Sequence, residues 1–160
     1  MQPIKSVLLV LLLVNTAVCA KTDKVNQWVL MDEAHAAIEQ KDFDRAYEVY
    51  GYAIEAGSHF AAVMLSAYDV ILDKSDEEVN GGIAKLKYYA NRGESFSRDF
   101  LAKFYFEGVN VPVNYKIAEG YYKQQALAGL KNQYLGKIYY EGLGTKKSLG
   151  KAVFYLLYPY

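Results

Sequence analysis

Apolar residues recur at helical spacing along the chain after Ala20, and the same pattern returns at a nearly constant interval. Three similar stretches end at Gly57, Gly93 and Gly129, which are equally spaced along the chain. In each stretch a small residue, a large residue four positions later and two more after that fall on one helix face. The glycine then supplies the left-handed residue with which many helices end. The pattern therefore predicts a repeated, glycine-terminated helix.

A second kind of helix precedes these stretches. The segment 100–108 matches the segment 134–142, one repeat further along the chain. In both segments three apolar residues share a face, as expected for the buried side of a short amphipathic helix. Ala102 and Gly136 are small at positions where a partner helix can approach closely.

The two helix types alternate, so the sequence predicts eight short helices in four antiparallel pairs. Their expected ranges are 25–40, 43–56, 59–72, 79–92, 97–107, 115–128, 131–141 and 149–158. One pair cannot bury its apolar face alone, so neighbouring pairs are expected to stack into an α/α solenoid. The acidic stretch 73–78 is interpreted as a solvated connector between two of the helices.

We expect a single all-α repeat domain over residues 21–160. Its repeats are predicted near 28–57, 58–93, 94–129 and 130–160. The last copy reaches Pro159-Tyr160 without a closing glycine, which predicts either a short capping helix or an exposed apolar flank. The residues of that flank are Val153, Phe154, Leu156 and Leu157. Exposed apolar surface of this kind is a candidate partner site.

The segment 1–20 has the features of a signal peptide. Lys5 precedes an apolar run over 6–14 that is too short to span a bilayer, which takes about 20 residues. Small residues follow, and Ala20 lies before the charged segment that starts at Lys21. We expect cleavage after Ala20 and a periplasmic or secreted mature chain. Lipidation of Cys19 is the poorer match, because Thr16 and Val18 depart from a lipobox.

Composition narrows the function classes. The formal net charge is +0, with 18 basic and 18 acidic residues. The sequence therefore lacks the excess of basic residues that would indicate nucleic-acid binding. One Cys and 2 His argue against a disulfide scaffold, a zinc site and a cysteine nucleophile. We expect no metal, no cofactor and, once the leader is removed, no membrane partner. The 16 Tyr supply many amphipathic rings.

No catalytic constellation is evident in the sequence. His35 and His59 are the only imidazoles, and no His-Glu-x-x-His motif is present, so each is interpreted as a packed or solvated residue. Phosphate-binding loops and nucleophile elbows are not found either. The acidic stretch 73–78 lacks the glycine that a calcium loop has at its sixth position. We therefore do not expect an enzyme.

The segment 135–155 carries a family resemblance. Its Leu135-Gly136, Tyr139, Gly142, Gly144 and Lys151-Ala152 resemble the pattern of the Sel-one-like repeat (SLR) family, a relative of the tetratricopeptide repeat. Ser148 stands where the pattern has a helix-capping Asp. The copy at 101–129 has Asn114 as the cap, and Asn110 tolerates a left-handed backbone in place of the second glycine. The copy at 65–93 is degenerate.

Over residues 28–155 the resemblance implies a short right-handed α/α solenoid of about four helix pairs. In this family the first helix of each pair lines the concave side. Phe100, Lys103 and Glu107 share one helix face, and Tyr134, Lys137 and Glu141 repeat that face in the next copy. These six residues are the candidate partner-binding ladder. The alternative is that both rings are half-buried between repeats and that the Lys–Glu pairs are surface ion pairs.

The resemblance implies a non-enzymatic, exported protein-binding module. Small exported bacterial proteins that resemble this family include immunity proteins that neutralise secreted toxins such as lipases, which gives one candidate role. A second is an envelope scaffold or secreted adaptor that assembles several proteins. A third, of another class, is a periplasmic enzyme with an unrecognised site. The sequence names no partner and leaves the oligomeric state open.

Overall fold

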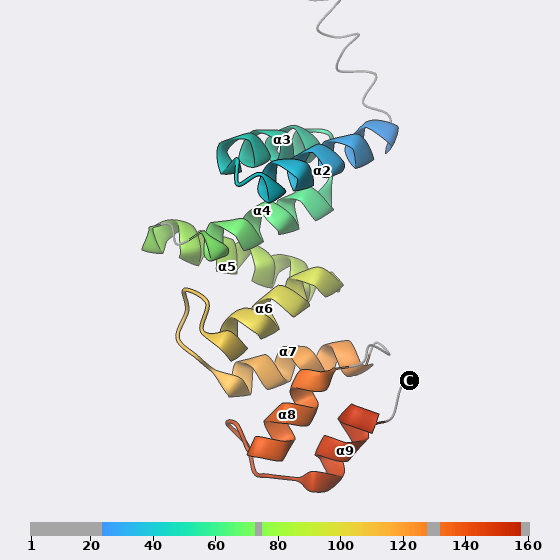
Figure 1. Ribbon diagram of the computed structural model, residues 1–160, viewed down its shortest axis with the longest axis vertical. Coiled ribbons are helices and arrows are strands. Elements are labelled where there is room, and N and C mark those ends of the chain that lie inside the picture. Colours follow the sequence, from blue (N-terminus) through green and yellow to red (C-terminus); the bar gives the residue numbers. More distant parts are fainter. Residues whose placement is uncertain (1–23, 73–74, 128–131, 158–160) are drawn as a thin grey trace, which may run out of the picture. The chain divides into compact units, whose positions relative to one another are not determined.

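The computed structural model describes residues 24–72, 75–127 and 132–157, and every regular element in these ranges is an α-helix. The helices are α2 (Lys24–Glu39), α3 (Phe43–Glu55), α4 (His59–Ile71), α5 (Asp76–Asn91), α6 (Ser95–Glu107), α7 (Tyr115–Leu127), α8 (Gln133–Glu141) and α9 (Leu149–Leu157). The predicted helices lie close to these bounds, and the largest difference is at the start of α5 (Figure 1). The prediction of an all-α chain is confirmed for these residues. The predicted leader, 1–20, lies outside them.

Two compact units make up the chain, one up to Ala62 and the other from Val63, and the boundary falls inside α4. In the first unit α2 contacts α3. Their buried face is built from small and medium side chains, with the ring of Tyr50 fully enclosed. The side-chain amide of Gln27 on α2 donates to the Ala56 carbonyl beyond α3 at 2.6 Å, which ties the two helices together at one end.

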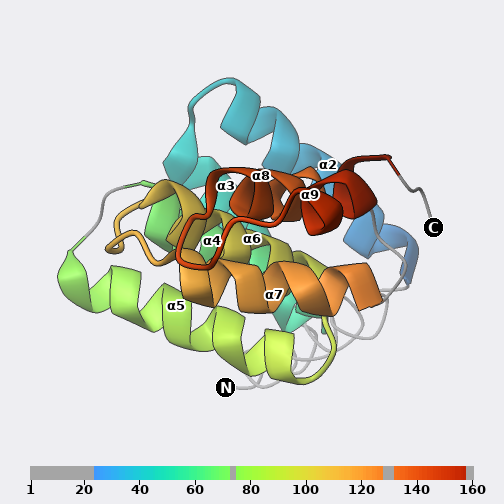
Figure 2. The same cartoon turned by 90° about the horizontal axis from the view of Figure 1, so that it is seen from below.

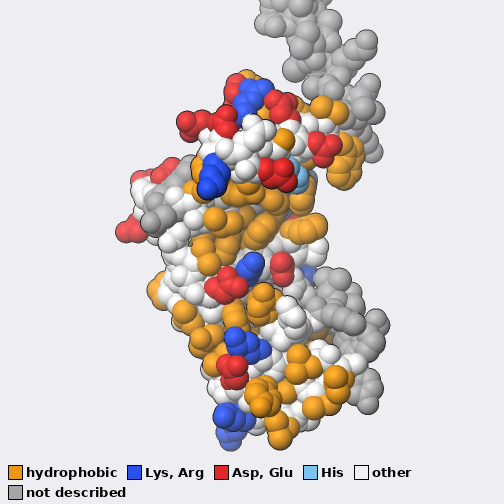
Figure 3. Space-filling view, viewed as in Figure 1, with side chains coloured by type: hydrophobic (Ala, Val, Ile, Leu, Met, Phe, Trp, Pro, Cys, Tyr) orange, Lys and Arg blue, Asp and Glu red, His pale blue; other side chains and the backbone are white. Residues whose placement is uncertain are grey.

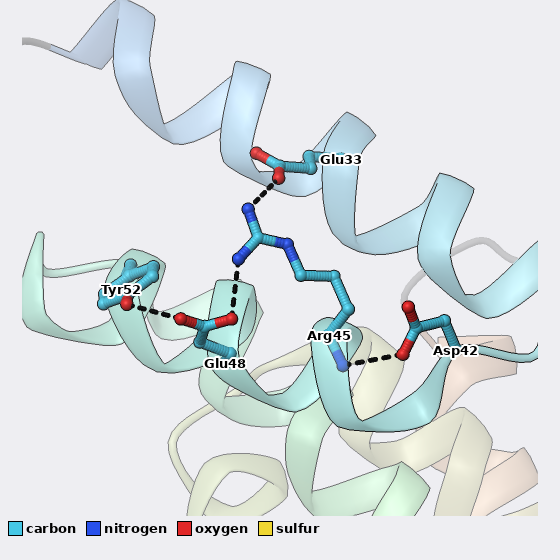
Figure 4. A network of polar contacts seen from close by, with 5 residues as sticks. All are labelled: Glu33, Asp42, Arg45, Glu48 and Tyr52. Atoms are coloured by element: carbon cyan, nitrogen blue, oxygen red, sulfur yellow. Dashed lines mark hydrogen bonds and ion pairs between the residues drawn. The ribbon is translucent and has the colours of Figure 1, made fainter.

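An exposed polar network also joins α2 to α3 (Figure 4). Arg45 donates to Glu33 on α2 at 2.5 Å and to Glu48 on its own helix at 2.6 Å. Tyr52 donates to the other oxygen of Glu48 at 2.7 Å, and Asp42 caps α3 through the Arg45 backbone N–H. Solvent screens such exposed pairs, so the network fixes side-chain positions more than it stabilises the fold.

The described residues of the second unit form two successive apolar clusters. The first joins the second half of α4 to α5 and α6, and includes Val63, Ile83, Leu86, Leu101 and Phe104. The second joins α6 to α7, α8 and α9. Figure 2 shows α6 and α8 on one side of this unit and α5 and α7 on the other. Because α6 contributes to both clusters, each helix pair is completed by its neighbour.

The loop between the two helices of a repeat has the same backbone in two copies. Gly108 and Gly142 end α6 and α8 in the left-handed region, at φ 77° and 76°. Asn110 and Gly144, two positions further on, are also left-handed, at φ 49° and 63°. The predicted role of Asn110 is therefore confirmed. Gly57 and Gly93 also have positive φ, as predicted, whereas Gly129 lies outside the described residues.

Each loop closes by a backbone hydrogen bond that returns to the preceding helix. The N–H of Asn114 donates to the Tyr105 carbonyl at 2.8 Å, and the N–H of Ser148 donates to the Tyr139 carbonyl at 2.9 Å. Both donors then cap the next helix with their side chains, as predicted. The repeat that is visible in the sequence is thus a repeat of the backbone as well.

The interpretation of 73–78 as a connector is wrong for its last three residues. Asp76–Glu78 form the first turn of α5, because Ser75 caps that helix. The Ser75 hydroxyl accepts from the Glu78 N–H, and the Glu78 carboxylate accepts from the Ser75 N–H. This capping box satisfies two backbone donors and makes the acidic residues the first turn of the helix. There their negative charges interact favourably with the positive end of the helix dipole.

Helix α5 crosses α4 at a glycine. A Cβ added to Gly82 would lie 2.6 Å from the Ser66 carbonyl oxygen of α4 and 3.0 Å from a Val70 methyl group. A Cβ added to its neighbour Gly81 would meet nothing within 4 Å. Two adjacent glycines of one helix therefore differ in function: one permits the close crossing, and the other faces open space.

We predict opposite effects for the two alanine substitutions. Gly82→Ala should lower the free energy of unfolding by about 1–3 kcal/mol, because the backbone of α4 must move away. Gly81→Ala should raise it by up to about 1 kcal/mol through helix propensity alone. Urea unfolding followed by circular dichroism measures both. Equal effects of the two substitutions would contradict the close crossing of α4 and α5.

Candidate functional site

The second unit contains an open groove with a volume of about 610 Å³. Four helices or the residues at their ends contribute to it: α6, α7, α8 and α9. The lining residues are Ser95, Phe96, Asp99, Gln125, Asn132, Gln133, Tyr134, Tyr155 and Leu156. We call this surface the α6–α9 groove. It crosses two successive repeats, so its shape depends on how the repeats stack.

Three polar side chains link the helices across the groove. The amide of Gln125 on α7 donates to the Asp99 carboxylate on α6 at 3.2 Å. The amide of Asn132 donates to the Gln125 carbonyl oxygen at 3.0 Å, and its own oxygen caps α8 by accepting from the Leu135 N–H. Gln125 and Asn132 are buried, whereas Asp99 is exposed. The buried amides therefore hold an exposed carboxylate in a fixed position at the groove.

Aromatic rings pack beneath one wall of the groove. The ring of Tyr134 stacks on Tyr122 with a centroid distance of 4.9 Å and an interplanar angle of 2°. Phe106 meets Tyr134 edge-to-face at 5.2 Å, and Lys137 lies 5.6 Å from the centre of the Phe106 ring. These rings come from α6, α7 and α8, so the wall of the groove is part of the packing between repeats.

The hydroxyl of Tyr122 has no hydrogen-bond partner among the described residues. The side chain is fully buried. Burial is the largest cause that raises the pKa of this hydroxyl well above its usual range. The neighbouring Tyr134, Asp99 and Glu107 raise it further. The group therefore stays neutral, and its lost hydration lowers the stability of the fold.

The hydroxyl of Tyr139, at a nearby boundary between repeats, does have a hydrogen-bond partner. Its hydroxyl donates to the Glu119 carboxylate on α7 at 2.6 Å, and Lys123 pairs with the same oxygen at 2.6 Å. Burial alone would raise the Glu119 pKa, but the hydrogen bonds from Lys123 and Tyr139, with the charges of Lys123 and Lys151, lower it. Tyr155 of the groove stacks on Tyr139 at 5.7 Å. The ion pair lies within α7, and the Tyr139 hydrogen bond joins it to α8 next to Tyr155 of the groove.

The predicted binding ladder divides into two kinds of residue. Phe100 and Tyr134 are half-buried and pack against the two clusters of the second unit. The four charged members, Lys103, Glu107, Lys137 and Glu141, are exposed. Of the six, only Tyr134 lines the groove. Both rings therefore contribute to packing, and the charged positions form an exposed stripe along α6 and α8.

Sequence reasoning missed most of the groove. Phe96 and Asp99 precede Phe100 and Lys103 on the same stripe of α6, so helical spacing could have found them. Gln125 and Asn132 belong to neighbouring helices, and their pairing depends on how the helices pack. No pattern in the sequence gives that packing.

Among the described residues, the groove lining offers no catalytic group pair. These lining residues include one carboxylate, Asp99, and neither an imidazole nor a thiol. His35 is exposed in the first unit, with its ring 6.5 Å from that of Tyr50, and His59 is exposed at the start of α4. Within 24–72, 75–127 and 132–157, no group of three or more His, Cys, Asp or Glu is placed to hold a metal ion. None of the helices described is both long and apolar enough for a transmembrane span.

Comparison with known proteins places this geometry in a known fold. No model of a protein family matches the chain, and no curated protein does. A crystal structure does match: a protective antigen, present in uropathogenic Escherichia coli strains, that displays an SLR fold. The TM-score is 0.57 and the sequence identity is 22%. This chain has an SLR fold.

The match covers 79% of this chain and 28% of the antigen, so the chain corresponds to a part of that longer SLR protein. The predicted SLR resemblance and the α/α-solenoid class are thereby confirmed. At this identity the likeness concerns the SLR fold alone. Helical-repeat folds of this kind present extended surfaces for binding other proteins.

Two buried tyrosines provide a matched test of this packing. Tyr122→Phe should raise the free energy of unfolding by about 1 kcal/mol, because it removes a buried hydroxyl without a partner. Tyr139→Phe should lower it by about 1.5–3 kcal/mol, because Glu119 loses a hydrogen bond while it stays buried. Thermal and urea unfolding of the two variants would measure both changes. A loss of stability in Tyr122→Phe similar to that in Tyr139→Phe would mean that the two hydroxyl environments are not as described.

Proposed function

We propose that this chain is a protein-interaction module that binds a segment of another protein in the α6–α9 groove. The observation that carries the proposal is the groove itself. It places an exposed carboxylate, Asp99, beside exposed Phe96 and half-buried Tyr134 and Tyr155. Aromatic anchors with a few fixed polar groups are typical of protein-binding surfaces.

The charged stripe extends this surface along the helices. Lys103 and Glu107 continue the row that Phe96 and Asp99 begin on α6, since these positions recur at helical spacing. Lys137 and Glu141 continue from Tyr134 on α8 in the same way. All four charged residues are exposed. We propose that they form the rim of the site, where alternating charge selects the partner more than it adds affinity.

The finer proposal concerns the class of partner. If the predicted leader directs export, the partner is an exported or envelope protein. A toxin neutralised by this chain, such as a lipase, is one case, and a scaffold that assembles several envelope proteins is the other. The two differ in the set of proteins bound: an immunity protein has one toxic partner whose activity it abolishes, and a scaffold has several.

The test compares variants of the groove with a matched pair elsewhere. Proteins captured from the envelope fraction by the immobilised chain are purified, and their affinity is measured by calorimetry. Phe96→Ala with Asp99→Asn should weaken binding by more than about 1 kcal/mol, because both residues lie in the groove. Lys103→Ala with Lys137→Ala should have a smaller effect that depends on ionic strength.

The control is Tyr88→Ala with Glu77→Gln. It removes one exposed ring and one exposed carboxylate from α5, outside the groove. This variant should bind as the unchanged chain does. Equal affinity of the groove variant and the control, with helical content retained in both, would refute the groove as the binding site. Turnover of a small molecule by the pure chain, lost on replacement of both His35 and His59, would instead favour an enzyme.

A further inference from the structure

Helix α9 exposes a face that is covered on the equivalent helix of the preceding repeat, α7. Helices α7 and α9 occupy equivalent places in successive repeats, and Ala118 and Ala152 are buried in both. In this alignment Tyr122 corresponds to Leu156, and Glu119 corresponds to Val153. On α7 these positions are 0% and 8% exposed, and on α9 they are 54% and 46% exposed.

What covers the face on α7 is the next helix of the chain. Tyr134 of α8 stacks on Tyr122, and Tyr139 of α8 donates its hydroxyl to Glu119. Leu156 of α9 contacts α8 on the other side, since a Cβ added to Gly136 would overlap its side chain. The face of α9 is therefore built like an inner boundary between repeats, with its inward contact made and its outward contact open among the described residues.

The open face is also apolar. Leu149 and Leu157 are 67% and 68% exposed next to Val153 and Leu156. The exposed Lys146 and Lys147 lie in the loop just before α9, whereas Lys151 lies over the Tyr139 ring of α8. The segment 143–157 contains three Lys and no acidic residue. Figure 3 shows hydrophobic and basic side chains together over the α8–α9 end. Two such faces would repel each other, so the charge disfavours an α9-to-α9 pairing and favours an acidic occupant.

This chain contains an acidic helix pair of its own. The segment 24–55, which spans α2 and α3, carries seven acidic and three basic residues. On α2, Trp28 and Val29 are 73% and 58% exposed, and Asp32 lies one turn further along the helix. An apolar edge within an acidic surface complements the apolar, basic face of α9 in both respects.

We infer that the α9 face of one copy binds the α2–α3 helix pair of a second copy, so that copies associate head to tail. The contact covers the outward face of α9 with the first repeat of the next molecule. Such an interface is heterologous, because two different surfaces meet, and it leaves one free face of each kind at the ends of every open assembly. Association should therefore depend on protein concentration and weaken with salt.

The test uses two variants of the full chain that each block one face. Val153→Glu with Leu157→Glu blocks the α9 face and leaves the α6–α9 groove unchanged, since neither residue lines it. Trp28→Ala with Asp32→Lys blocks the α2 face. Sedimentation across a concentration series should show oligomers of the unchanged chain. Each variant alone should associate at least about tenfold more weakly.

An equimolar mixture of the two variants decides the geometry. Each variant keeps the face that the other has lost, so the mixture should form a one-to-one dimer and nothing larger. Leu127→Glu, which changes an 89% exposed leucine on α7, is the matched control and should oligomerise like the unchanged chain. A monomeric unchanged chain, a mixture that stays monomeric, or dimers of the α2 variant alone would overturn the inference. Leu156 belongs to both the groove and the α9 face, so partner binding is measured separately on the same variants, at a concentration that keeps them monomeric.

Discussion

A pair of short helices has an apolar face that it cannot cover by itself, and this constraint organises the second unit of the chain. At the boundary between α7 and α8 the requirement is met by side chains of the next helix. Tyr134 stacks on Tyr122, and Tyr139 donates its hydroxyl to Glu119. The boundary therefore combines ring packing with a buried carboxylate, and it is specific because this carboxylate must meet both a hydroxyl and the Lys123 ammonium.

The candidate site follows from the same stacking. The α6–α9 groove lies where successive repeats meet, and its polar side chains come from three different elements: Asp99 from α6, Gln125 from α7 and Asn132 from the start of α8. A change in the register of the helices would separate them. The groove is thus a property of the stacked repeats, which hold side chains from distant parts of the sequence in one surface.

Much of this architecture is local and could be predicted from the sequence. The helix faces, the glycine ends and the caps at Asn114 and Ser148 depend on residues within a few positions of each other. The apolar pattern places the start of α5 too late, because the capping box of Ser75 and Glu78 consists of polar residues that this pattern does not include. The groove depends on the crossing of helices, so the amides that pair across it carry no signal at helical spacing. For the same reason the sequence does not show that Phe100 and Tyr134 are half-buried. From helical spacing alone, either ring could face a partner or a neighbouring repeat.

The central claim is that each helix pair is stabilised by the pair that follows it, and amide hydrogen exchange tests this most directly. Helix α7 is covered by α8, whereas the outer face of α9 is open among the described residues. At a concentration low enough to keep the chain monomeric, amides of α7 should exchange far more slowly than those of α9. Protection of α9 equal to that of α7 in the monomer would contradict the account.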